Sequence, residues 1–165
     1  MRFPYHSLSI RMQPYLVEYL TSKLDELFSQ QPHKTCIIAF IRPFVRVNEY
    51  NPTEEILHHG PDYLTFIFRW AEFVEIPPGH VPYISANDQK TIEKLFRMHF
   101  KEILANYYFD KYKFMMELHG RSKAHSIIMQ FCSDHHITFN ARTCDTLRKI
   151  AVRHIKNHPL QGWKI

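Results

Sequence analysis

The hydrophobic residues of this 165-residue chain change their spacing near residue 85. Before that point apolar and polar residues alternate in short runs, which is typical of half-buried strands, whereas after it apolar residues recur every three or four positions, as in amphipathic helices. The change predicts an α+β fold, with a small antiparallel sheet and one packed helix over residues 1–84 and a helical half over residues 85–165. Whether the two halves share one core stays open.

The first half is expected to contain short strands around a single helix. Alternation predicts strands at residues 7–12 and 64–70, and Pro14 opens a helix whose apolar stripe continues to about Ser29. The apolar run 35–41 predicts a buried strand that is broken at Pro43 and resumes at 44–47, and residues 72–76 could return as a hairpin. Residues 48–62 are expected to form a loop, and the stretch PPGHVP at 77–82 is expected to end the sheet.

The second half is expected to contain four helices. Ser85, with Asp88 three residues later, predicts an N-cap for a helix that continues to about Tyr108. A short helix should follow over 109–119, closed by Gly120, and a third should begin after Ser122. The connector HHITFNAR then leads to a last helix that Thr143 caps and Pro159 ends, which gives the chain a helix-turn-helix-like end.

Composition narrows the class of protein. With 45% apolar residues and few glycines, the chain can bury one substantial core, and it contains no apolar run of the roughly 20 residues that cross a bilayer. The start MRFPYHSLSI lacks the layout of a secretion signal, so we expect a cytoplasmic protein without membrane contact. Three cysteines do not indicate a disulfide framework, and we expect them to be reduced.

The positive charge is concentrated at the end of the chain. From Arg121 onward there are eight Lys and Arg against two acids, whereas the first 120 residues hold thirteen against fourteen. Clustered cations release counterions from a phosphate backbone, so this asymmetry favours a nucleic-acid partner. Solubility and chance remain the alternative explanation.

The last expected helix combines an apolar side with a basic one. Leu147, Ile150 and Ala151 share one side, and Lys149, Arg153 and Lys156 stand on another at i, i+4 and i+7. A basic helix braced by a preceding amphipathic helix is typical of helix-turn-helix proteins, which place the second helix in the major groove. The connector here is longer than the tight turn of that motif and contains no glycine, which favours a looser three-helix or winged-like variant. The residues expected to contact nucleic acid are Arg142, Arg148, Lys149, Arg153 and Lys156 on phosphates, with Asn140 and Thr146 as polar readers.

Other chemistry has weaker sequence support. Cys132 with His135, and His154 with His158, have the spacing of zinc ligands, but nothing in the sequence shows four ligands converging. Glu55 with His58, and Glu72 with Glu75, read as solvated polar pairs. Because phosphate-binding, nucleophile-elbow and metalloprotease motifs are all missing, we expect no enzyme activity, no cofactor and no metal.

Several segments together resemble a known group of proteins. The segments are PYLVEYL, VEIPPG, YISANDQKTIEKLFRMHFKEIL and SIIMQFCSDHHITFNARTCDTLRKIAVRHIKN. In this order they resemble small uncharacterised proteins encoded by phages and integrated mobile elements of Bacteroidetes. The positions that carry the resemblance best are Phe131, Ile137, Asp145, Leu147, Lys149 and Arg153. The resemblance implies a small regulatory or DNA-associated accessory protein and supplies no catalytic residues.

The sequence therefore leads to two main functional hypotheses, with an enzyme whose site has no recognised motif ranked third. The first is a non-enzymatic accessory or regulatory protein that binds nucleic acid, duplex DNA above all, through the basic helix at 143–158. The alternative is a protein-interaction or structural component of a phage or mobile element, in which the basic helix is solvated or takes part in a homo-oligomer.

Overall fold

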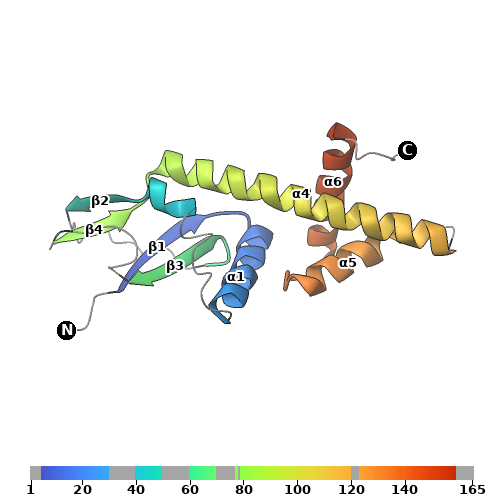
Figure 1. Ribbon diagram of the computed structural model, residues 1–165, viewed down its shortest axis with the longest axis horizontal. Helices are drawn as coiled ribbons and strands as arrows, with labels where there is room; N and C mark the ends of the chain where they lie inside the picture. The colour runs from blue at the N-terminus through green and yellow to red at the C-terminus, as the bar shows by residue number, and fades with distance from the viewer. Residues whose placement is uncertain are drawn as a thin grey trace. The chain divides into compact units, whose positions relative to one another are not determined.

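The computed structural model describes residues 5–29, 40–49, 60–69, 77, 79–119 and 123–158. It confirms an α+β fold in which strands and one helix come first and helices make up the C-terminal half (Figure 1). The chain divides into two compact units, Met1–Leu95 and Phe96–Ile165. The division falls inside a helix, ten residues after the change in hydrophobic spacing.

The first unit contains an antiparallel pair of strands, β1 (Tyr5–Arg11) and β3 (Tyr63–Arg69). In their register Leu8 lies opposite Phe66 and Ile10 lies opposite Leu64. Leu8, Ile10 and Leu64 are all buried, as alternation along a strand with one covered face requires. Both strand predictions are thus confirmed in the main, although β1 ends at Arg11, one residue before the predicted end, and Trp70 lies outside the described residues.

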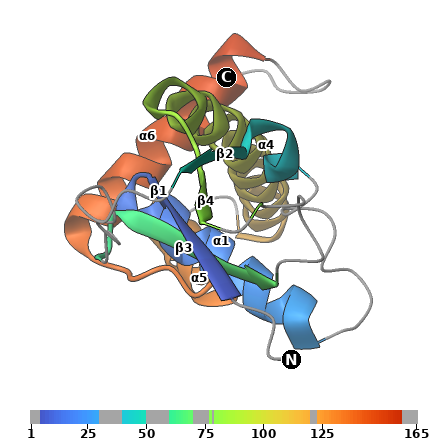
Figure 2. The same cartoon turned by 90° about the vertical axis from the view of Figure 1, so that its left-hand side faces the viewer.

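Helix α1 (Pro14–Ser29) begins and ends where the sequence predicted. Proline fixes its own φ in the helical range and needs no hydrogen-bond acceptor in the first turn, so it can start a helix without loss. Leu16 and Leu20 are buried, and α1 contacts β3. Figure 2 shows α1 beside the β1–β3 pair, which is the expected arrangement of one helix on a small sheet.

A second antiparallel pair, β2 (Arg46–Glu49) and β4 (His80–Tyr83), corrects two predictions. The expected end of the sheet at 77–82 is wrong, because Pro82 lies within β4 opposite Val47. Each strand of a two-stranded sheet has one free edge, where a residue without an N–H loses no ladder hydrogen bond. The expected loop 48–62 is also wrong at its start, since β2 continues to Glu49.

The prediction of a strand at 35–41 is wrong for Phe40 and Ile41, the two residues of this segment that the structure describes. Phe40 and Ile41 are helical, and a 3-10 turn, η1 (Arg42–Phe44), follows them with Pro43 inside it. Ile41 is buried, so the apolar run does reach the core, but as a turn of helix. Three predicted segments lie outside the described residues: the start of this strand at 35–39, most of the predicted loop (50–59) and the predicted hairpin strand at 72–76.

Helix α4 (Ala86–His119) is a single helix of 34 residues, so the prediction of two helices meeting near Tyr108 is wrong. Its N-cap is as predicted: the backbone N–H of Asp88 donates to Ser85 Oγ at 3.2 Å, and Ser85 Oγ donates to Asp88 Oδ2 at 2.6 Å. No glycine or proline occurs between its ends, so every residue can continue the backbone ladder. Gly120 lies outside the described residues.

In the second unit α5 (Ala124–Asp134) and α6 (Ala141–Asn157) pack with the C-terminal part of α4 (Figure 1). Phe131 of α5 is fully buried, with its ring centroid 5.9 Å from that of Phe100 and 5.2 Å from that of Tyr107, both in α4. Edge-on aromatic pairs of this kind stabilise a helical core beyond the area they bury. The expected N-cap Ser122 is wrong, because α5 begins at Ala124 with Lys123 as its N-cap and no side-chain capping hydrogen bond. Pro159, the expected end of α6, lies outside the described residues.

Candidate nucleic-acid interface

One side of α6 is anchored in the core of the second unit. Cys144, Leu147, Ala151 and Ile155 have exposed fractions of 6, 0, 0 and 2%. An α-helix turns about 100° per residue, so these four side chains share a sector of about 80°. The orientation of α6 about its own axis is therefore fixed by burial.

The opposite side of α6 carries a row of cations. By the same helical geometry four basic residues fall within a sector of about 60°, roughly opposite the buried sector. All four are exposed. We call this row the basic ridge; it consists of Arg142, Lys149, Arg153 and Lys156.

The other expected contact residues lie around the basic ridge. Arg148 is exposed but sits at the border of the buried sector, and Thr146 is exposed beside Arg153 on the helical projection. Asn140 has a structural task, because its side-chain oxygen accepts a hydrogen bond from the backbone N–H of Thr143 at 2.9 Å. The prediction that Thr143 caps α6 is therefore wrong: Asn140 is the N-cap, and α6 begins at Ala141.

Asp145 divides the cations of α6 into paired and unpaired groups. Its Oδ1 lies 3.1 Å from Arg148 Nη2, and its Oδ2 lies 2.5 Å from Lys149 Nζ. The hydrogen bonds from Lys149 and then Arg148 hold the pKa of this carboxyl below its usual value. Within the described part of the chain, Arg142, Arg153 and Lys156 make no ion pair.

Sequence reasoning assigned Asp145 no role at the site, although its signal is present. Arg148 and Lys149 follow it at i+3 and i+4, the two spacings at which side chains meet on a helix surface. The spacing between opposite charges, and not only the count of cations, determines which of them are available to a ligand.

The connector between α5 and α6 is short, and a backbone hydrogen bond joins it to the end of α5. Residues 135–140 link the helices, and the backbone N–H of Ile137 donates to the carbonyl of Cys132 at 2.9 Å. His136 adopts a left-handed conformation with φ of 53°, a region that glycine usually occupies in such turns. Cys144 Sγ lies 3.3 Å from His125 Nδ1, which ties the first turn of α6 to the first turn of α5.

The possible zinc ligands do not come together in one site, although the rings of His154 and His158 lie with their centroids 4.8 Å apart. No group of three or more His, Cys, Asp or Glu capable of holding a metal occurs in the described ranges. Cys132 is fully buried, and the ring of His135 packs 4.4 Å from that of Phe131. Burial raises the pKa of the Cys144 thiol and so favours its protonated form. Glu55, His58, Glu72 and Glu75 lie outside the described residues.

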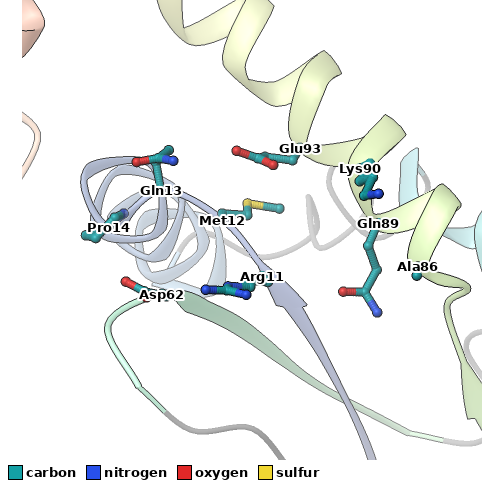
Figure 3. A pocket seen from close by; sticks show the side chains of 9 residues that line it. All are labelled: Arg11, Met12, Gln13, Pro14, Asp62, Ala86, Gln89, Lys90 and Glu93. Atoms are coloured by element: carbon teal, nitrogen blue, oxygen red, sulfur yellow. The ribbon is translucent and has the colours of Figure 1, made fainter.

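The first unit contains a hollow of about 480 Å³ between the start of α4 and the β1–α1 junction (Figure 3). Two bases and two acids line it, Arg11 and Lys90 with Asp62 and Glu93. None of these four forms an ion pair with another described residue. Their charges balance, so the hollow has no preference for a polyanion, in contrast to the outward face of α6.

None of the helices in the described ranges, α4 included, has the length and apolar character needed to cross a bilayer. No known protein family matches the chain, and no curated protein or solved structure shows detectable similarity to it. The functional conclusion therefore depends on the geometry and charge of the chain itself.

Proposed function

We propose that this protein is a non-enzymatic DNA-binding accessory or regulatory protein that contacts the phosphates of duplex DNA through the basic ridge. The observation that carries the proposal is the division of α6 into a fully buried side and a cationic side opposite to it. A helix fixed in this way presents its cations outward in one row, so several of them can reach a phosphate backbone at once.

The distribution of charge supports a polyanionic partner. The second unit holds twelve Lys and Arg against five Asp and Glu, a net charge of +7, whereas the first unit holds nine against eleven, a net charge of −2. The entire positive excess of the protein thus belongs to the unit that contains α6. Such a charge distribution raises the association rate with nucleic acid and provides the counterion release that drives binding.

The composition of α6 favours a duplex over a single strand. Proteins that bind single strands stack bases on aromatic side chains, and α6 contains no Phe, Tyr or Trp. From Arg142 to Lys156 the basic ridge is about 21 Å long, which corresponds to about six base pairs. The diameter of a helix, about 10–12 Å, matches the width of about 12 Å of the major groove.

The test is binding of a fluorescent duplex of about 20 base pairs, well over the length of the basic ridge, followed by anisotropy. The double variant Arg153→Ala/Lys156→Ala should lose most binding, because it removes two of the three unpaired cations of α6. A matched control is Lys94→Ala/Lys123→Ala, which removes two exposed cations outside α6 that make no ion pair with another described residue. Circular dichroism should show that both variants keep their helices, since all four side chains are exposed.

Three results would speak against the proposal. One is equal loss of binding in the two double variants, which would show that net charge matters and the basic ridge does not. Another is tighter binding to a single strand of the same sequence than to the duplex. The third is unfolding of Arg153→Ala/Lys156→Ala, which would show that these side chains stabilise the structure.

A second candidate function, interaction with a protein partner, is favoured by one observation. Phe114 and Leu118 lie one turn apart on α4 with exposed fractions of 58 and 59%. Large apolar side chains that expose more than half of their surface next to one another are typical of interaction sites. Light scattering of the wild type and of Phe114→Ser/Leu118→Ser tests this: concentration-dependent self-association that the variant abolishes would support a second copy of the chain as partner.

A further inference from the structure

A single acidic residue interrupts the cationic surface of α6. Asp145 is the only Asp or Glu between Ala141 and Asn157, and on the helical projection it lies directly beside the basic ridge. Both of its oxygens are in use, one with Arg148 and the other with Lys149. These pairs exist in the free protein, before any ligand arrives.

The spacing makes the pairs easy to form. A carboxylate that precedes a cation by three or four residues meets it on the helix surface, and this order is the more favourable one for a helix. The three side chains are about half exposed, at 48% for Asp145, 50% for Arg148 and 57% for Lys149. An exposed ion pair is weak, so it adds little to the stability of the fold. Asp145 can nevertheless affect binding, because its carboxylate changes the charge of the surface that a ligand contacts.

A phosphate that approaches this part of α6 meets a carboxylate and two cations already engaged with it. To bind Arg148 or Lys149, the phosphate must replace an existing charge-assisted hydrogen bond, and the carboxylate that remains repels it. The unpaired cations Arg142, Arg153 and Lys156 impose no such cost. Only three of the five basic side chains on α6 are therefore fully available to a phosphate backbone.

We propose that Asp145 limits the sequence-independent affinity of α6 for duplex DNA by holding Arg148 and Lys149 out of phosphate contact. The inference rests on the proposed function and adds a selectivity residue to it. Contacts to phosphate carry no sequence information, so a residue that weakens them leaves base contacts a larger share of the binding. Asp145 is thus a positioning residue that acts through the two cations it holds.

The expected change in duplex affinity can be calculated from the number of phosphate contacts. The logarithm of the association constant falls with the logarithm of salt concentration by about 0.9 for each phosphate contact. Three available cations give a loss of about 40-fold in affinity between 50 and 200 mM salt, and five give about 500-fold. If the two proteins bind equally at 1 M salt, the release of Arg148 and Lys149 tightens binding about 20-fold at 200 mM.

The experiment compares wild type, Asp145→Asn and Glu117→Gln on the same duplex at both salt concentrations. Asp145→Asn removes the charge while keeping a polar side chain of the same shape. Glu117→Gln is the matched control, because Glu117 pairs with Lys113 at i,i+4 on α4, and the change removes one acid and releases one lysine away from α6. We expect tighter binding and a steeper salt dependence for Asp145→Asn, with little change for Glu117→Gln.

The outcomes separate this inference from the proposed function. If the wild type binds but Asp145→Asn binds no tighter and shows the same salt dependence, the inference is overturned and the proposed function stands. Equal tightening by Glu117→Gln would also overturn it, since net charge alone would then explain the effect. Binding by Asp145→Asn but not by the wild type would overturn the proposed function, because the three unpaired cations would then not suffice to bind a duplex, and the inference that rests on it would fall as well. If none of the three proteins binds, both the inference and the proposed function fail.

Discussion

The sharpest single-residue contrast in the second unit is between Arg153 and Lys149. Both side chains are exposed on the basic ridge, one turn apart, and both carry one positive charge. Arg153 has no ion pair within the described ranges, whereas Lys149 Nζ lies 2.5 Å from Asp145 Oδ2. Arg153→Ala should therefore remove a phosphate contact, and Lys149→Ala should remove a charge that Asp145 already offsets.

The size of the difference follows from the number of available cations. Wild type and Lys149→Ala should both lose about 40-fold in duplex affinity between 50 and 200 mM salt, since each retains three available cations. Arg153→Ala retains two and should lose only about 12-fold. At 50 mM salt Arg153→Ala should also bind distinctly more weakly than Lys149→Ala.

Anisotropy titrations of the three proteins against one labelled duplex supply these numbers. Circular dichroism and urea unfolding confirm that each variant is folded, which the exposure of both side chains leads us to expect. If Lys149→Ala loses as much affinity as Arg153→Ala, or flattens the salt dependence equally, pairing with Asp145 does not restrict Lys149 and the count of available cations is wrong.

Further predictions concern the stability of the second unit and are checked by urea unfolding. Leu147→Ala should destabilise the protein by about 2–5 kcal/mol, because the side chain is fully buried; a smaller loss would place it outside the core. Tyr107→Phe should cost about 1 kcal/mol at pH 7, since it removes the 2.8 Å hydrogen bond from the Tyr107 hydroxyl to Asp134. This hydrogen bond lowers the pKa of Asp134, so its contribution to the free energy of unfolding is present above the ordinary pKa of a carboxyl group and is lost as the pH falls through the lowered pKa of Asp134. A difference in stability between wild type and Tyr107→Phe that is as large at pH 2 as at pH 7 would contradict this. His136→Gly should stabilise the protein by about 0.5–1 kcal/mol, because glycine adopts the left-handed backbone without strain. This is the net gain after the entropy that glycine adds to the unfolded chain. A loss of stability would show that the His136 side chain makes stabilising contacts.

The elements that the sequence predicted well are those where one local signal dominates. Pro14 marked the start of α1, and the alternation around Leu8 and Leu64 predicted the strands β1 and β3, although not that they pair with each other. Ser85 and Asp88 formed the expected N-cap. In each case the favourable local geometry agrees with what packing requires, so propensity and tertiary structure lead to the same result.

The errors arose where two local signals competed. Pro82 indicated the end of a sheet, but a two-stranded sheet has free edges that accept proline. The helix prediction stopped near Tyr108 because the apolar side chains beyond it no longer keep to one face, and Phe114 and Leu118 are exposed there. No glycine or proline interrupts this stretch, so the hydrogen-bond ladder of α4 can continue through it to His119, with one backbone hydrogen bond gained for each residue added.

At the candidate site, the sequence predicted the outward row of cations but not which of them are available. The alignment of Arg142, Lys149, Arg153 and Lys156 follows from helical periodicity alone. The choice of cap needed finer ranking: Asn140 and Thr143 are both acceptable N-caps, but asparagine is the stronger, and the helix begins after it. The role of Asp145 required attention to acids as well as bases on the same helix.

The most direct test of the central claim is the affinity of the wild-type protein for one duplex at 50 and 200 mM salt. Three cations available to phosphates on α6 predict measurable binding that weakens about 40-fold between these concentrations. The absence of duplex binding at 50 mM salt, or an affinity that salt leaves unchanged, would contradict the claim that the outward face of α6 binds nucleic acid.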